Sequence, residues 1–194
     1  MSQSNIGSGD GYSSPVTSRE LAGHVAIVTG AGRNIGRAIA LELAAYGASV
    51  GVNVRNNEQE ALGVVKAIED LGARAVPVVG DIGDVEGVER AVRRTRNSLG
   101  PITLLVCNAG MRATKSALDC TVDEWQKLID VNLSATFHFI RSVVEDMKKA
   151  DFGRIIAITG GIAHYPTPSA HDNHAHLAAS KAASEVLLRS RIAS

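Results

Sequence analysis

The sequence predicts a doubly wound α/β fold, a parallel sheet covered by helices on both faces, and three observations carry this prediction. Short runs that are apolar throughout alternate with helical stretches along the chain, as in parallel sheets buried on both faces. A glycine-rich turn follows the first apolar run and leads into a helix. The 194 residues show no internal repeat and suit one domain with a sizeable core. Right-handed crossovers then give a doubly wound sheet in three layers, α/β/α, for which we expect strand order 3-2-1-4-5.

The elements follow in a regular order. Val25 to Val28 is a continuous apolar run, and a turn at 47–48 precedes the second strand. Gly72, Gly100 and Gly153 each stop a helix, because glycine favours the end of a helix over its interior. We expect strands at 25–28, 49–54, 74–79, 102–107 and 154–159, and helices from the glycine turn to about 46 and at 58–71, 85–99, 122–150 and 176–193.

The N-terminus is rich in Ser, Gly, Asn and Asp and lacks the pattern of a secretory signal. We therefore expect a disordered tail over residues 1–20 and a single domain over residues 21–194. Cys107 and Cys120 are too few for a disulfide framework, which favours reduced thiols and a cytoplasmic protein. The sequence also has no apolar stretch long enough to cross a bilayer.

The charge balance argues against nucleic acid and anionic membranes as partners. Lys and Arg number 20, as do Asp and Glu, so the formal net charge is zero and no basic field is expected. Aromatic residues make up only 4% of the chain, which leaves few stacking platforms for single strands.

The turn Gly30 to Gly36 predicts a phosphate site. Its glycines let the backbone approach a pyrophosphate, and the N–H groups and dipole of the following helix favour an anion. The residues expected at the phosphate are Gly30, Arg33, Asn34, Ile35 and Gly36. A glycine-rich turn alone can also be a simple loop or helix stop.

Several motifs make the chain resemble the short-chain dehydrogenase/reductase family, and within it the 3-oxoacyl-ACP reductases, from about Leu21 to the C-terminus. Residues 29–36 are similar to the family's Thr-Gly-x-x-x-Gly-x-Gly, with Asn34 at the usual middle glycine. Asn tolerates left-handed backbone angles, so this departure is mild. Gly80-Asp81-Ile82 and Asn108-Ala109-Gly110 match further family motifs. The resemblance implies a Rossmann-like fold.

The resemblance also implies roles for these residues. Asp81, with Ile82 beside it, is expected to hold the adenine ring, although an Asp here can also cap a helix or shape a loop. Asn108, Ala109 and Gly110 are expected to brace the sheet and line the cofactor groove.

The residues after the second strand favour NADP over NAD. NAD-preferring relatives have an acidic residue near Val54, whereas here Val54 is followed by Arg55. Arg33 adds a second cation, and two guanidinium groups suit a 2′-phosphate. The alternative is that both arginines are only solvated.

Two residues match the reacting end of the family's site. By resemblance, Asn132 holds a water in a proton relay, and Lys181 binds the nicotinamide ribose and lowers the pKa of a neighbouring tyrosine. The alternatives are an Asn on the flank of a helix and a solvated lysine.

The family pattern breaks at two catalytic positions. Leu177 stands where the family has its tyrosine, and Gly160 stands where it has its serine. A proton donor is still needed, and Tyr165 or His176 are the preferred candidates. The other candidates are Thr159, His164, His171 and His174. The four histidines between 164 and 176 lack a familiar ligand spacing, so no metal site is predicted.

The resemblance implies an oxidoreductase that transfers hydride to or from a small carbonyl or alcohol substrate with NADP(H). The alternatives are a catalytically dead dinucleotide-binding protein and a structural subunit. Family members dimerise through the helices at 122–150 and 176–193, so a homodimer or homotetramer is expected. Family members also continue past the last helix, and we expect the substrate-covering part to be lacking from this sequence.

Overall fold

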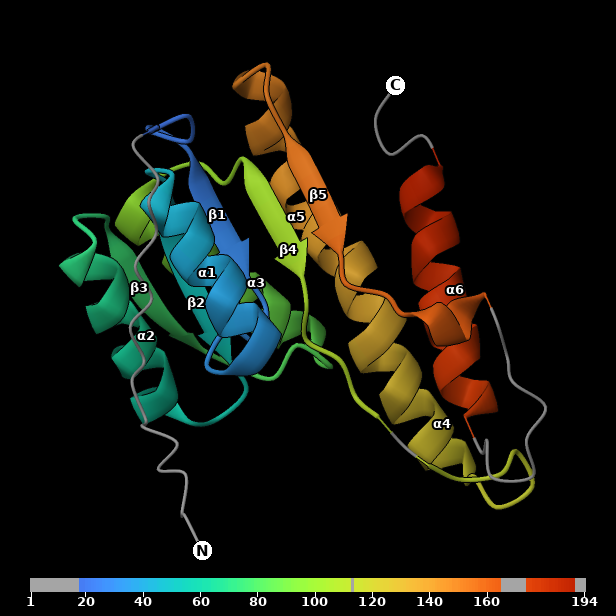
Figure 1. Cartoon of the computed structure of the whole chain (residues 1–194). Coiled ribbons are helices and arrows are strands. Elements are labelled where there is room, and N and C mark those ends of the chain that lie inside the picture. Colours follow the sequence, from blue (N-terminus) through green and yellow to red (C-terminus); the bar gives the residue numbers. More distant parts are fainter. Residues whose placement is uncertain (1–17, 113, 165–173, 191–194) are drawn as a thin grey trace, which may run out of the picture.

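A five-stranded parallel sheet forms the centre of the computed structural model, which describes residues 18–112, 114–164 and 174–190 (Figure 1). The strand order is β3-β2-β1-β4-β5, which confirms the predicted 3-2-1-4-5 topology. Val25 pairs with Ser49, and Ala26 pairs with Leu104. The strands are β1 (Val25–Val28), β2 (Ser49–Val54), β3 (Ala75–Val79), β4 (Leu104–Cys107) and β5 (Arg154–Ala157).

Helices cover both faces of the sheet and bury two separate apolar clusters. The helices are α1 (Asn34–Ala45), α2 (Glu58–Asp70), α3 (Val85–Leu99), α4 (Val122–Ile129), α5 (Ala135–Lys149) and α6 (Ala175–Arg189). Along β1, Ala26 and Val28 pack with α1 and α2, whereas Val25 and Ile27 pack with α3 and α5. This alternation is the period of a strand buried on both sides.

The prediction of one continuous α-helix over 122–150 was wrong in the middle of the segment. Helix α4 ends at Ile129, a π-helical turn (η1) covers Asp130–Ser134, and α5 begins at Ala135. The apolar period continues through this turn, so the sequence pattern does not reveal it. π-turns inside helices are frequent at functional sites, and this one carries the buried Asn132.

Several boundaries also differ from the prediction. The fourth strand begins at Leu104 rather than residue 102, because Ile102 donates its N–H to the carboxylate of Asp146 instead of to a strand. The fifth strand ends at Ala157 rather than residue 159, and a short 3₁₀ turn (η2, Gly161–Ala163) follows. The last helix ends at Arg189. The predicted disordered tail lies almost wholly outside the described residues.

The structure also bears on the expectations for the two cysteines and for membrane-spanning helices. Cys107 and Cys120 are both free thiols. Among the described helices, none combines the length and the apolar character that a membrane crossing requires.

Candidate dinucleotide groove and reacting end

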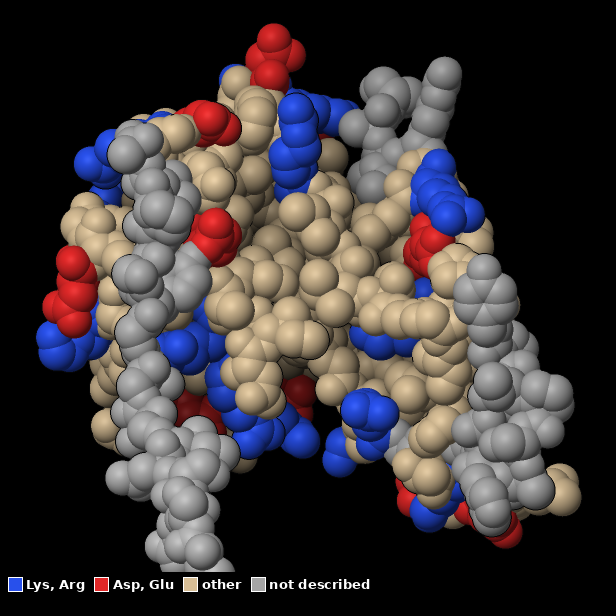
Figure 2. Space-filling view, in the orientation of Figure 1, with Lys and Arg blue, Asp and Glu red and all other residues tan. Residues whose placement is uncertain are grey.

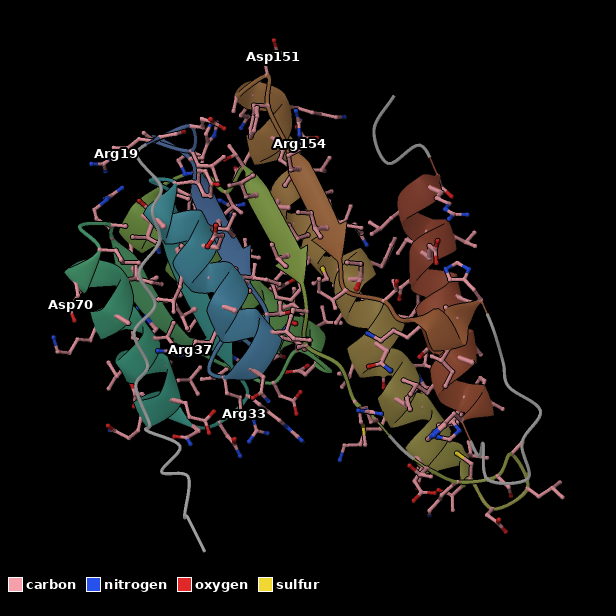
Figure 3. The ribbon with its side chains drawn as sticks, viewed as in Figure 1. Arg19, Arg33, Arg37, Asp70, Asp151 and Arg154 are labelled. Atoms are coloured by element: carbon pink, nitrogen blue, oxygen red, sulfur yellow. The ribbon has the colours of Figure 1, made fainter. Side chains whose placement is uncertain are left out.

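A groove of about 830 Å³ opens at the rim where the parallel strands end. Ligands of doubly wound sheets bind at this rim, outside the carboxyl ends of the strands. Figure 2 shows Lys and Arg side chains gathered along it, and Figure 3 places Arg33 there and Asp151 and Arg154 at the opposite rim. The predicted residues that line the groove are Gly30, Arg33, Asn34, Ile35, Gly36, Arg55, Asp81, Ile82, Asn108, Ala109 and Gly110.

The glycines of the turn between β1 and α1 lie too close to neighbouring atoms to be replaced by larger residues. A Cβ atom on Gly36 would lie 2.2 Å from the Gly30 carbonyl oxygen and 2.5 Å from Asn108 Nδ2. Gly30 itself has a φ of +62° and faces Ala109. Asn34 has a φ of +49°, so the left-handed conformation expected for this Asn is confirmed. The turn is built to bring backbone close to whatever fills the groove.

The first residues of helix α1 line the groove, and the first turn of the helix contains no acidic side chain. Its N-cap, Arg33, is extended and makes no side-chain cap. The first N–H groups of a helix have no partner inside it, and they carry the positive end of its dipole. This end of α1 therefore suits a phosphate.

Asn108 ties the end of β4 to the glycine turn. Its Nδ2 donates to the carbonyl oxygens of Thr29 at 2.9 Å and Gly30 at 3.2 Å. In return, Thr29 Oγ1 accepts from the backbone N–H groups of Asn108 and Ala109. These bonds brace neighbouring strand ends, as the resemblance implied for this motif.

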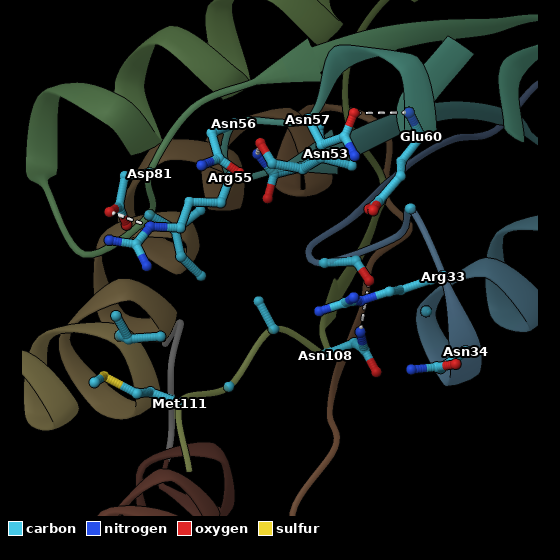
Figure 4. Close-up of a pocket in the computed structure, with 18 of the residues that line it drawn as sticks. Arg33, Asn34, Asn53, Arg55, Asn56, Asn57, Glu60, Asp81, Asn108 and Met111 are labelled. Atoms are coloured by element: carbon cyan, nitrogen blue, oxygen red, sulfur yellow. Dashed lines mark hydrogen bonds and ion pairs between the residues drawn. The ribbon is translucent and has the colours of Figure 1, made fainter. Parts of the chain in front are cut away.

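One end of the groove brings two arginines and two carboxylates together (Figure 4). Arg55 Nε donates to Asp81 Oδ2 at 2.8 Å, and Asp81 Oδ1 accepts from the Gly83 N–H. Asp81 thus holds one edge of the Arg55 guanidinium, while the terminal nitrogens of Arg55 make no hydrogen bond with the described residues. Arg33 extends into the same pocket from the glycine turn.

Sequence reasoning missed Glu60, which supplies the second carboxylate. This residue lies in the first turn of α2 and lines the groove, and a Cβ atom on Gly32 would lie 2.9 Å from one of its carboxylate oxygens. The signal that could have found it is the N-cap Asn57, whose side chain accepts from the Glu60 N–H and so starts α2 at the groove. The other lining residues not predicted include Asn53, Asn56, Arg112 and Lys127.

Lys181 lies against Gly110, a residue that lines the groove, near the ends of β4 and β5. Its Nζ donates to the Ile158 carbonyl oxygen at 2.8 Å, and a Cβ atom on Gly110 would lie 3.2 Å from it. Burial lowers the pKa of Lys181, and Cys107 opposes this shift weakly. Burial likewise raises the pKa of the Cys107 thiol to about 11, so Cys107 remains neutral.

Asn132 is held by protein groups on every side. Its Oδ1 accepts from the Met111 N–H at 2.7 Å, and its Nδ2 donates to the Met111 carbonyl and to Ser180 Oγ. Ser184 Oγ donates to the Asn132 backbone carbonyl at 2.7 Å, a carbonyl of the π-turn. Asn132 therefore joins the β4–α4 loop, the π-turn and α6.

The predicted proton donors are scattered. Leu177 is buried and Gly160 is exposed, and neither carries a proton to give. His176 is 2% exposed, and neither ring nitrogen has a hydrogen-bond partner among the described residues. His164 Nε2 lies 2.8 Å from the Glu185 carboxylate on α6. Thr159 is half-buried and His174 is the N-cap of α6, whereas Tyr165 and His171 lie outside the described residues.

Within the described ranges, no group of three or more His, Cys, Asp and Glu side chains is placed to hold a metal ion.

Comparisons with known proteins agree with this geometry. The family model described as short chain dehydrogenase matches residues 24–192. A hydroxynaphthalene reductase-like protein of Metarhizium brunneum is 38% identical over 178 residues, which cover 92% of this chain and 65% of that protein. A hydroxynaphthalene reductase of Aspergillus fumigatus is 34% identical over 169 residues, covering 87% and 60%. The chain thus spans less than two thirds of the length of these curated relatives.

Solved structures give the same result. A dehydrogenase/reductase from Sinorhizobium meliloti superposes with a TM-score of 0.78 at 37% identity, covering 88% of this chain and 66% of the other. A metagenomic short-chain oxidoreductase in complex with NADP superposes with a TM-score of 0.80 at 30% identity, covering 87% and 75%.

Proposed function

The chain belongs to the short-chain dehydrogenase/reductase family, and from that premise we propose that it is an oxidoreductase that uses NADP(H) to transfer hydride to or from a small carbonyl or alcohol substrate. The observation that carries the proposal is the groove itself. A glycine turn that admits no side chain at Gly36 borders a cavity of about 830 Å³ with cations at one end. The bound nicotinamide would supply or accept the hydride.

Gly30 to Gly36 and the start of α1 would hold the pyrophosphate, and Asn108 to Gly110 would line the nicotinamide half. Arg33 and Arg55 would select the 2′-phosphate, because the terminal nitrogens of Arg55 stay available while Asp81 holds its Nε. A solved relative in complex with NADP supports this choice. Asp81 would orient Arg55 as well as border the adenine. The Glu60 carboxylate, which lies against Gly32, would oppose a phosphate bound nearby.

The substrate would be a ketone or the corresponding alcohol. The names of two relatives, hydroxynaphthalene reductase and a similar protein, make a bicyclic ketone a sensible first probe. Those proteins are longer than this chain, so family membership alone does not assign their substrate to it.

Calorimetry with NADPH and NADH on the 194-residue chain tests the cofactor, and we expect tighter binding of NADPH. NADPH oxidation is then followed with 2-tetralone and 9,10-phenanthrenequinone as probes. Absence of heat with either cofactor, on protein that melts cooperatively, would contradict the proposal.

A second candidate function is a non-catalytic NADP-binding protein. Leu177 and Gly160 favour it, because both lack the hydroxyl that the family uses at these positions. Tight NADPH binding with no turnover of any probe would select this alternative.

Assembly and location complete the proposal. Trp125, Phe137 and Val186 lie exposed on α4, α5 and α6, which suits a homodimer or homotetramer formed through these helices. Light scattering tests this, and a monomer at micromolar concentration would contradict it. Two free thiols favour the cytoplasm.

A further inference from the structure

The reacting end of the groove needs a proton donor, and the described side chains narrow the choice. Leu177 and Gly160 have no transferable proton. Asn132 uses its Oδ1 and both N–H groups of its amide in bonds to Met111 and Ser180, and Ser184 occupies its backbone carbonyl. Asn132 thus has a structural role. Both N–H groups of its amide donate to described residues, so neither is available for a proton relay.

Lys181 is placed differently. An ammonium group has three N–H donors, and the described part of the chain accepts one of them, through the Ile158 carbonyl oxygen at 2.8 Å. No carboxylate of the described residues forms an ion pair with Lys181. The ammonium packs against Gly110, a residue that lines the groove, because a Cβ atom there would lie 3.2 Å from Nζ.

We propose that Lys181 is itself the general acid of the reaction, in place of a hydroxyl at position 177, an inference that rests on the proposed oxidoreductase function. The reduced nicotinamide, when bound, supplies the hydride. As the new C–H bond forms and the C=O π bond breaks, Lys181 gives one N–H proton to the carbonyl oxygen. The product is the alcohol, the nicotinamide is oxidised, and the neutral amine regains a proton from water.

The surroundings of Lys181 suit this role. Burial disfavours the charged ammonium and lowers the pKa of Lys181. The lowered pKa makes the ammonium a stronger acid, which releases its proton more readily at neutral pH. Cys107 faces it from β4 and remains a neutral thiol. Two carboxylates on the adjoining elements are engaged elsewhere: Glu185 of α6 pairs with Arg189 and His164, and Asp130 of the π-turn accepts from Gln126.

The decisive variant is Lys181→Arg, because arginine keeps the positive charge but does not release a proton at accessible pH. We expect NADPH affinity within about fivefold of the native chain and a kcat for 2-tetralone reduction lower by about 100-fold or more, the usual contribution of a general acid. Lys66→Arg, on the exposed face of α2 and paired with Asp70, is the matched control and should change neither value.

The pH profile gives a second readout. Native kcat should fall on the alkaline side as Lys181 loses its proton, with a midpoint below the ordinary 10.5, and Lys181→Arg should lack this limb. A Lys181→Arg rate within about threefold of native would overturn the proposal, because a general acid contributes about 100-fold or more. Loss of NADPH binding in step with rate would also overturn it and make Lys181 a binding residue only. No turnover by the native chain, with NADPH bound, would instead refute the proposed function.

Discussion

The two halves of the groove differ in how tightly the chain constrains them. At the glycine turn, one added methyl group would collide with backbone, since a Cβ on Gly36 would lie 2.2 Å from a carbonyl oxygen. At the reacting end, a Cβ on Gly160 would meet no described atom within 4 Å, and Leu177 replaces a hydroxyl with a buried apolar side chain. The contrast teaches that sterics restrict the glycine-turn half, whereas the half proposed to hold the reacting groups has room for other side chains.

We expect the largest effect from substituting one glycine in each half of the site, Gly36 in the glycine turn and Gly160 at the other end. Gly36→Ala should abolish measurable NADPH binding and cost about 1–3 kcal/mol of stability, because the clash involves backbone that cannot move aside. Gly160→Ser adds a larger side chain in open space, so its melting temperature should stay within about 2 °C of native. Calorimetry and thermal melts provide both measurements. Equal damage from the two variants would remove the distinction between the halves.

The next largest effects should come from changing the charged residues Arg55 and Glu60, which are expected to alter NADPH binding more than NADH binding. Arg55→Met should weaken NADPH binding about 10- to 100-fold, the value of a charge-assisted hydrogen bond, and should change NADH binding much less. Glu60→Gln removes a nearby carboxylate and should strengthen NADPH binding a few-fold. Calorimetry with both cofactors checks the pair. An Arg55→Met variant that loses NADH and NADPH equally would show that Arg55 does not read the phosphate.

The sequence predicted the cofactor half better than the reacting half, for a physical reason. Asn34 suits its left-handed backbone, and Gly36 is required by the close approach of the Gly30 carbonyl within the same turn, so a short local pattern indicates both. The alternation of strand and helix indicates a parallel sheet, and the expected strand order is that of the dinucleotide-binding folds that the chain resembles. The long-range contacts of Asn132 with Met111, Ser180 and Ser184 span up to 52 positions, and no local pattern encodes them. The π-turn was missed because the apolar period continues through it, and the groove position of Glu60 was missed because it depends on a contact with Gly32 in a different turn of the chain.

The hydrogen bonds around Asn132 provide a smaller test, confined to the reacting half. Ser184→Ala removes the hydroxyl that donates to the Asn132 carbonyl in the π-turn, a buried bond whose loss should cost about 1–3 kcal/mol. Denaturant unfolding measures the loss. Ser190→Ala is the control, because its exposed hydroxyl bonds to Val186 of the adjoining helical turn, and its stability should change by less than about 0.5 kcal/mol. Equal values for the two variants would mean that the π-turn does not depend on Ser184.

The smallest expected effect lies at the start of α4, where the reacting half meets solvent. Glu124 completes a capping box with Thr121 and pairs with Lys115. The Lys115 hydrogen bond, followed by the Thr121 backbone N–H, lowers the pKa of Glu124 from 4.5 to about 2. Because the folded-state value is depressed, the stabilisation is present above pH 4.5 and is lost as the pH falls towards 2.

Lys115→Met should therefore raise the pKa of Glu124 towards 4.5 and leave less stability to lose in acid, with little change in melting temperature at about pH 7, because exposed ion pairs stabilise proteins weakly. NMR titration of the Glu124 carboxyl measures the shift directly. Lys66→Met, which removes an exposed lysine on α2, should leave that titration unchanged. A Glu124 pKa that remains near 2 without Lys115 would assign the shift to the capping box, and the start of α4 would then be fixed by local backbone geometry, as the glycine turn is.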